Sequence, residues 1–221
     1  MPLQQTKNLL DAHAQRILSG DAFDAENSMS ASMFDLRMGV EESPHLTEAV
    51  QWQQKHLASR IDSLRRTNRT VRCLSLGCGH LLEAELSEAI LQRNAMIFAV
   101  DPDPRNLCVV SKNYAHCDVD PICASPMDVL NGTVRFGHLD LAYAAGFPDS
   151  LSQVMATAFT AKLFSMLDTG GVVIVPSALK VRSRPEIFAF ASEVPKSDIA
   201  SQRYYQDPFG VIGYLELKKA R

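Results

Sequence analysis

The chain is predicted to be an α/β protein with a doubly wound, mostly parallel seven-stranded sheet. A C-terminal antiparallel β-hairpin closes this sheet, and an N-terminal helical extension precedes it. Three observations predict this fold. Short apolar runs alternate with helical patterns from Val71 onward, one run ends in the glycine turn Gly77-Cys78-Gly79, and two β-rich runs end the chain with no helix between them. Alternation of this kind is typical of parallel strands joined by crossover helices that cover both faces of a sheet.

The bulk properties are those of a soluble domain. The 221 residues can bury one sizeable core, and the 46% hydrophobic and 21% charged composition is ordinary. The net charge of −3 gives no electrostatic reason to expect a nucleic-acid or membrane partner. The start of the chain has no signal-peptide pattern, and no apolar run reaches transmembrane length. Five cysteines without C-x-x-C spacing favour reduced thiols, so we expect a cytoplasmic location.

The first 68 residues are expected to form helices. An apolar stripe in the first helix stops at Gly20, a residue type common just after a helix end. Thr47 can cap a later helix, whose apolar face carries Val50, Leu57, Ile61 and Leu64. We therefore divide the chain into an N-terminal helical lid or extension at 1–68 and a core at 69–221.

The core alternates strands and helices in order. The predicted strands span 71–76, 95–100, about 121–125, 139–145 and 171–176, and the predicted helices span about 81–93, 104–114 and 150–167. Gly170-Gly171 is expected to end the last of these helices. The runs 202–206 and 211–217 are separated by a short turn, so they should pair as an antiparallel hairpin. A plain dinucleotide-binding domain would continue with another βαβ unit instead.

The glycine turn predicts a nucleoside cofactor. Glycines between a buried strand and a helix let the backbone approach a ligand, and the free N–H groups of the helix start would point at it. Asp101 ends the next apolar run, where a carboxylate can accept hydrogen bonds from ribose hydroxyls. The nicotinamide fingerprint fails because it needs glycine at Leu82, and the Gly-Lys-Ser/Thr of a P-loop is absent.

The segment Ser75-Leu76-Gly77-Cys78-Gly79-His80-Leu81 resembles the first motif of the class I S-adenosylmethionine-dependent methyltransferases. In that family an apolar strand is followed by acidic-x-Gly-x-Gly-x-Gly. The resemblance covers about residues 68–220, and the approach to the fifth strand and the closing hairpin are also similar. It implies a Rossmann-like core and S-adenosyl-L-methionine as the cofactor. Two positions depart from the pattern, with Ser75 at the acidic position and Leu81 at the last glycine.

The same resemblance assigns the cofactor contacts. It implies that Asp101 holds the ribose, that Asp128 lies near the adenine amino group, and that Met127 or Val129 packs on the ring. The full expected set is Ser75, Gly77, Cys78, Gly79, Asp101, Pro102, Met127, Asp128, Val129, Ala144, Ala145 and Gly146. A carboxylate at position 75 would help to orient the turn and the cofactor's ammonium group, whereas Ser75 offers a neutral hydrogen bond. Leu81 is expected to forbid the positive φ that glycine permits.

The catalytic residue is left unassigned, with His80 and Tyr143 as candidates. His80 can equally cap the helix start as a neutral side chain, and Tyr143 can equally belong to the core. Asp101 and Asp103 could form a metal site with residues further along the chain, namely His116, Cys117, Asp118 and Asp120. The neighbouring prolines make turns the simpler explanation, so no metal is expected.

The predicted reaction is in-line methyl transfer to a small, partly apolar metabolite, achieved mainly by positioning. Phe34, Met38 and Phe147 are the expected substrate contacts, with the N-terminal helices as a lid. The same apolar residues can instead pack on the sheet or form a homodimer contact. Two other functions stay open: an enzyme that uses the bound sulfonium for a reaction other than methylation, and a non-catalytic binding or partner protein with this fold.

Overall fold

The computed structural model describes residues 45–65, 69–145, 149 and 151–220. In this part of the chain, seven strands form one sheet in the order β3-β2-β1-β4-β5-β7-β6. The strands are β1 (Val71–Leu76), β2 (Ala95–Asp101), β3 (Val119–Cys123), β4 (Leu139–Ala144), β5 (Leu167–Ala178), β6 (Ile199–Gln206) and β7 (Ile212–Lys219). Strands β1 to β5 are parallel, and β7 is antiparallel to both β5 and β6. The predicted mostly parallel sheet with a C-terminal hairpin is confirmed.

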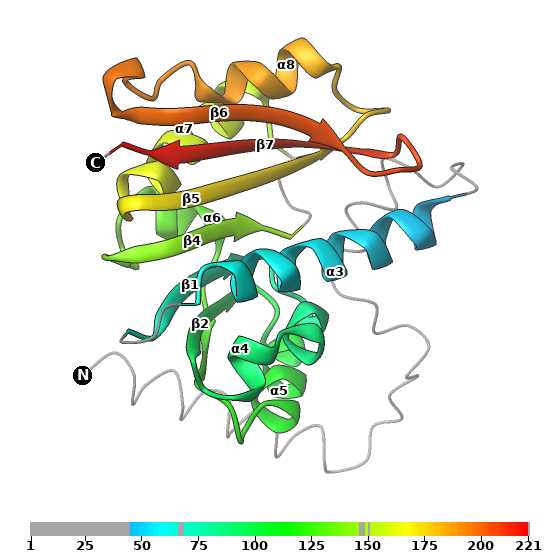
Figure 1. Ribbon diagram of the computed structural model, residues 1–221, viewed down its shortest axis with the longest axis vertical. Coiled ribbons are helices and arrows are strands. Elements are labelled where there is room, and N and C mark those ends of the chain that lie inside the picture. Colours follow the sequence, from blue (N-terminus) through cyan, green and yellow to red (C-terminus); the bar gives the residue numbers. More distant parts are fainter. Residues whose placement is uncertain (1–44, 66–68, 146–148, 150, 221) are drawn as a thin grey trace.

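Helices cover both faces of the sheet (Figure 1). The described helices are α3 (Leu46–Ser63), η2 (Leu82–Leu86), α4 (Glu88–Leu91), α5 (Pro104–Asn113), α6 (Pro126–Leu130), α7 (Gln153–Ser165), α8 (Arg184–Phe188), η4 (Ala189–Ala191) and η5 (Lys196–Asp198). Side chains of α3, α4 and α5 join one buried cluster, and those of α6, α7 and α8 join a second cluster on the other face. The three-layer arrangement predicted from the alternating elements is therefore present. Within the described ranges, no helix has the length and apolarity to cross a membrane.

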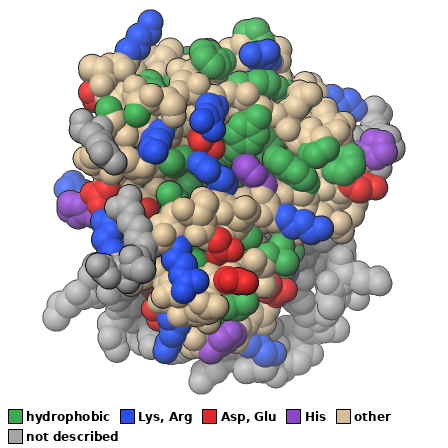
Figure 2. All heavy atoms as spheres, in the orientation of Figure 1, with side chains coloured by type: hydrophobic (Ala, Val, Ile, Leu, Met, Phe, Trp, Pro, Cys, Tyr) green, Lys and Arg blue, Asp and Glu red, His purple; other side chains and the backbone are tan. Residues whose placement is uncertain are grey.

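Helix α3 packs directly on the sheet. Its residues Leu57 and Ile61 are buried in the cluster that also contains β1 and β2 side chains. Trp52 and His56 stack with ring centroids 4.7 Å apart, and His56 Nε2 lies 2.8 Å from the hydroxyl of Tyr205 in β6. Figure 2 shows hydrophobic side chains gathered on this face of the molecule. The helix expected after Thr47 begins at Leu46, with His45 as its N-cap and no side-chain cap hydrogen bond, so the prediction that Thr47 caps it is wrong. This helix is part of the core layer, and the helices predicted before it lie outside the described residues.

The single helix predicted at 81–93 is wrong, because the chain forms η2 and α4 with a break at Ser87. Ser87 has extended backbone angles, φ −98° and ψ 117°, and its hydroxyl accepts the N–H of Ile90. Asp62 of α3 accepts hydrogen bonds from the Ser87 hydroxyl (2.7 Å) and the Ala89 N–H (2.9 Å). The break leaves the first N–H groups of α4 without helical partners. The side chains of Ser87 and Asp62 accept hydrogen bonds from this helix start, which offsets that loss.

Several strand boundaries also differ from prediction, and two of these differences have a clear physical reason. Strand β3 begins two residues earlier than expected and contains Pro121, which an edge strand tolerates because one side of its backbone has no strand neighbour. Gly170 and Gly171 lie inside β5 at a register shift against β4, so they form a bulge and do not end α7. A Cβ at Gly171 would lie 2.8 Å from the Leu139 carbonyl oxygen, which explains why glycine is needed there.

Candidate functional site

The turn after β1 has three residues in the left-handed region. Gly77 and Gly79 have φ of 60° and 53°, which glycine adopts freely. Leu81 has φ 55° and ψ 45°, so the expectation that leucine forbids a positive φ here is wrong. Its side chain is fully buried, its N–H bonds the Cys78 carbonyl at 2.8 Å, and its carbonyl accepts the Tyr114 hydroxyl at 2.9 Å. These contacts offset a backbone cost of roughly 1–2 kcal/mol.

The N–H groups of this turn are largely used inside the protein. The N–H of Cys78 bonds the Val100 carbonyl at 3.1 Å, and the N–H of Gly79 bonds Asp101 Oδ2 at 2.9 Å. With the Leu81 N–H also engaged, these three donors do not face a ligand, contrary to the sequence-based expectation. The turn therefore supplies few donors for a phosphate group.

Asp101 holds the turn to the neighbouring strand. Its side chain is buried, and Oδ1 accepts the N–H of Asp103 at 2.9 Å and the amide of Asn106 at 3.1 Å. Burial raises the pKa of Asp101, and the N–H groups of Asp103 and Gly79 act in the opposite direction. Asp101 is 0% exposed, and its two oxygens serve these three protein donors. Contact with a ribose hydroxyl stays a prediction, and holding the turn is a role that sequence reasoning missed.

The predicted adenine side is built on α6. Asp128 Oδ2 accepts the N–H of Ser125 at 2.8 Å and its hydroxyl at 2.7 Å, and these bonds lower the pKa of Asp128. Met127 is 43% exposed, whereas Val129 is fully buried in the core cluster beneath α6. Of the two proposed ring contacts, only Met127 is accessible. Pro102 is exposed on the connection between β2 and α5, and its contact with the cofactor stays a prediction.

The carboxyl end of β4 is fixed from two sides. The N–H of Ala145 bonds the Leu76 carbonyl at 2.9 Å, and the Gln53 amide donates to the Ala145 carbonyl at 2.6 Å. Gln53 in turn accepts the Tyr214 hydroxyl at 3.2 Å. Gln53 was missed from the sequence, although a single polar residue on the apolar face of α3 was a usable signal. Ala144 is buried beside this point, and the predicted contacts Gly146, Phe147, Phe34 and Met38 lie outside the described residues.

The two catalytic candidates have different environments. Tyr143 is fully buried, and its hydroxyl donates to Glu83 Oε1 at 2.8 Å, so it belongs to the core beneath the turn. Burial raises the pKa of Tyr143 far above its ordinary value. His80 lies in the turn and is half-buried, and burial lowers its pKa below 6.5. Because Tyr143 is buried in the core, His80 is the remaining candidate, and its catalytic role stays a prediction.

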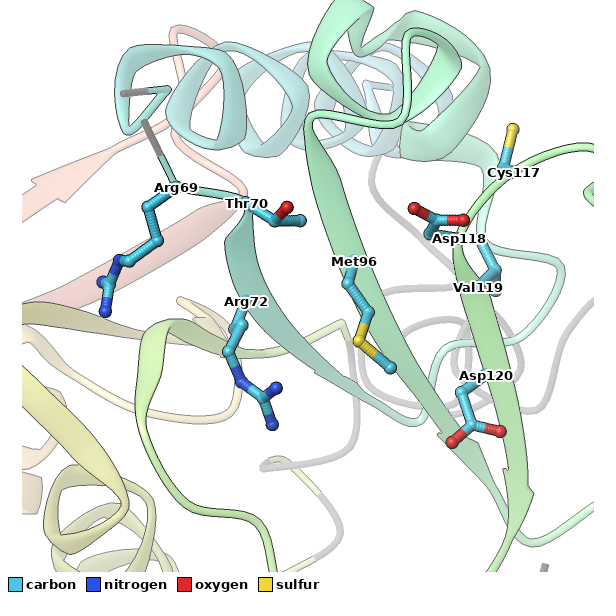
Figure 3. A pocket seen from close by; sticks show the side chains of 8 residues that line it. All are labelled: Arg69, Thr70, Arg72, Met96, Cys117, Asp118, Val119 and Asp120. Carbon is cyan, nitrogen blue, oxygen red and sulfur yellow. The ribbon is translucent and has the colours of Figure 1, made fainter. Parts of the chain in front are cut away.

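A hollow of about 650 Å³ lies at the opposite end of the sheet (Figure 3). It is lined by Arg69, Thr70, Arg72, Met96, Cys117, Asp118, Val119 and Asp120. These residues are at the amino ends of β1, β2 and β3, away from the glycine turn. Asp118 and Asp120 are thus at the other end of the sheet from Asp101 and Asp103. The aspartates that suggested a metal site therefore do not lie close together. The described residues contain no group of three metal-ligating side chains.

The strand order, the glycine turn after β1 and the acid that ends β2 define the fold of the class I S-adenosylmethionine-dependent methyltransferases. Solved structures share this fold. Magnesium protoporphyrin IX methyltransferase from Synechocystis, solved with bound S-adenosylmethionine, is 15% identical with a TM-score of 0.58, over 95% of this chain and 91% of that one.

Two further structures are similar. A candidate O-methyltransferase from Nostoc punctiforme is 15% identical with a TM-score of 0.59, over 98% of this chain and 68% of that chain. A candidate exported protein from Bordetella parapertussis is 11% identical with a TM-score of 0.68, over 88% of this chain and 81% of that chain. Comparison with protein-family models and with curated proteins finds no match. The similarity therefore establishes the fold, and the function must be argued from the site.

Proposed function

We propose that the protein is an S-adenosylmethionine-dependent methyltransferase acting on a small, partly apolar metabolite. The carrying observation is the turn after β1, where Gly77 and Gly79 have left-handed backbone angles, N–H donors are used internally, and the carboxyl groups of Asp101 and Glu83 lie alongside. A dinucleotide pyrophosphate would need free N–H donors, and those of Cys78, Gly79 and Leu81 are already engaged. S-adenosylmethionine has no phosphate and carries sulfonium and ammonium charges, so it suits this environment. The fold shared with a methyltransferase solved with this cofactor supports the same proposal.

The chemistry needs little from the protein beyond positioning. When bound, the cofactor supplies an activated methyl group for in-line displacement by a nucleophile. The chain would hold the ribose at Asp101, support the ring at Met127 and place the reacting end near Ala145. His80 is the candidate base for an acceptor that must lose a proton. Substrate contacts at Phe34, Met38 and Phe147, and a cytoplasmic location, are part of this proposal.

Calorimetry with S-adenosylmethionine and S-adenosylhomocysteine tests the cofactor assignment. We expect both to bind with dissociation constants in a range of about 1 μM to 1 mM, which is common for enzyme ligands. Release of S-adenosylhomocysteine in the presence of candidate small metabolites then tests methyl transfer. Absence of binding by either compound would contradict the proposal. Binding without turnover on any acceptor would favour the non-catalytic alternative, which the buried position of Tyr143 also favours.

A pair of neighbouring substitutions tests the ring contact. Met127→Ala should weaken S-adenosylmethionine binding about five- to tenfold, since it removes apolar contact with the ring, and should change stability by less than about 0.5 kcal/mol because Met127 is exposed. Val129→Ala should instead lower the free energy of unfolding by about 2 kcal/mol, because Val129 is fully buried. Calorimetry and urea unfolding measure the two effects. Equal losses of affinity in both variants, with stability unchanged, would contradict the assignment.

A further inference from the structure

Glu83 is a buried carboxyl group directly beneath the predicted cofactor site. It belongs to η2, is 4% exposed, and its Oε1 accepts the Tyr143 hydroxyl at 2.8 Å and the Ser75 hydroxyl at 3.4 Å. Ser75 and Tyr143 are register partners on the adjacent strands β1 and β4. Each lies two residues before the point where its strand meets the site, at Gly77 and at Ala145. The carboxyl group is therefore held close to the carboxyl ends of these two adjacent strands.

The groups that face Glu83 are neutral or acidic. From β1 and β4 they are the hydroxyls of Ser75 and Tyr143, and from the turn the thiol of Cys78. The phenol of Tyr114, the residue after α5, also faces Glu83. The charged side chains of α3, which packs against η2, are engaged or exposed: Arg60 pairs with Glu216, Asp62 caps α4, and Lys55 is exposed. Within the described ranges, no hydrogen bond or ion pair joins Glu83 to a basic side chain. A carboxylate here is buried without a countercharge, which is costly in the absence of a cationic ligand.

We propose that Glu83 is the charge partner of the α-ammonium group at the amino-acid end of the cofactor, uncharged in the free protein and ionised when the cofactor binds. This inference rests on the proposed function. Ionisation breaks the carboxyl O–H bond and releases the proton to solvent, so one proton leaves for each cofactor bound. Glu83 thereby supplies, from the segment after the turn, the negative charge that Ser75 lacks. It is a positioning residue for the cofactor and takes no part in the transfer itself.

The pH dependence has a definite sign. Burial raises the pKa of Glu83 above its ordinary value of 4.5, and the hydrogen bonds from its own backbone, Tyr143 and Ser75 partly counter this. A bound cation lowers that pKa, since it favours the charged form. Affinity for the cofactor should therefore rise with pH, by at most about tenfold per pH unit, until the pH exceeds the pKa of the free protein. Above that pH the affinity should be constant.

The test is calorimetry on the full chain from about pH 5 to about pH 8.5, a range chosen to bracket a raised carboxyl pKa. The probes are S-adenosylmethionine, S-adenosylhomocysteine and 5′-methylthioadenosine, which lacks the amino-acid end. The variants are Glu83→Gln, which keeps the acceptor oxygen, and Glu88→Gln, an exposed control on the neighbouring helix. Buffers of different ionisation enthalpy report the protons released on binding.

We expect wild type and Glu88→Gln to release up to one proton with the two amino-acid ligands and none with 5′-methylthioadenosine. Glu83→Gln should bind both amino-acid ligands at least about tenfold more weakly above neutral pH, without proton release, and should bind 5′-methylthioadenosine as wild type does. Tyr143→Phe should move the midpoint of the wild-type pH dependence upward, because it removes a bond that favours the charged carboxylate. This second variant gives a readout if Glu83→Gln fails to fold.

The failure of this inference is distinct from the failure of the proposed function. Tight binding of S-adenosylmethionine by Glu83→Gln with an unchanged pH dependence would overturn the role of Glu83 and leave the cofactor assignment standing. A wild-type pH dependence that Tyr143→Phe does not move would count against it in the same way. Failure of the wild type to bind any of the three probes would overturn both.

Discussion

Replacing Asp101 with asparagine is expected to weaken S-adenosylmethionine binding about 100-fold and to lower the free energy of unfolding by about 2–4 kcal/mol. The carboxylate accepts hydrogen bonds on both oxygens, from Gly79 on one and from Asp103 and Asn106 on the other. Asparagine has a single acceptor oxygen, so its amide would face at least one of these donors. The turn would lose its attachment to β2 and the ribose would lose its predicted acceptor. Calorimetry and urea unfolding measure the two losses.

Asp118→Asn is the matched control for that substitution. Asp118 lies at the other end of the sheet, 43% exposed in its side chain, and pairs with Arg93 at 3.3 Å. An exposed ion pair contributes little, so stability should change by less than about 1 kcal/mol and affinity should not change. If Asp101→Asn binds the cofactor as well as Asp118→Asn does, Asp101 is neither a ribose acceptor nor needed to shape the turn.

The strand pattern could be predicted because it depends on long apolar runs and on the absence of a helix before the last strand. The break at Ser87 could not, because it depends on Asp62, a residue of another helix that caps the second helix start. The bulge at Gly170 and Gly171 was misread for a similar reason. A glycine pair marks a helix end or a bulge equally well, and only the close approach of the Leu139 carbonyl decides between them.

Site residues could be predicted where their position follows from the end of a single strand. They could not be predicted where their position depends on side-chain contacts between different helices and strands. The glycine turn and Asp101 followed from local sequence. Glu83 did not, because its contacts with Ser75 and Tyr143 arise only when η2 folds back beneath β1 and β4. Leu81 was misjudged because intrinsic backbone preference was weighed without the burial that stabilises its left-handed conformation. The local sequence thus sets where the turn lies along the chain. Tertiary contacts set its backbone conformation and determine which charged groups lie beside it.

Arg182→Met is expected to lower the free energy of unfolding by about 3–5 kcal/mol, because it leaves Asp149 buried without its cation. The two side chains are 8% and 5% exposed, with Arg182 Nη1 3.1 Å from Asp149 Oδ1. Asp149 also accepts the N–H of Ala178 at 2.8 Å and the hydroxyl of Ser177, and Arg182 donates to the Leu151 carbonyl. The cluster ties the segment after β4 to the end of β5. The midpoint of thermal unfolding should fall by about 10 °C.

The loss can be assigned to the buried charge by adding Asp149→Asn to the same chain. Asparagine keeps an acceptor for Ala178 or Ser177 but carries no charge, so the double variant should recover at least about half of the stability that Arg182→Met loses. Arg184→Met, two residues away and exposed over the Tyr204 ring, should cost less than about 1 kcal/mol. Because the segment after β4 is predicted to lie beside the methionine end of the cofactor, the double variant should also bind S-adenosylmethionine more tightly than Arg182→Met. A double variant as unstable as the single one would show that Arg182 acts through its bond to Leu151 and its packing, and not through the charge of Asp149.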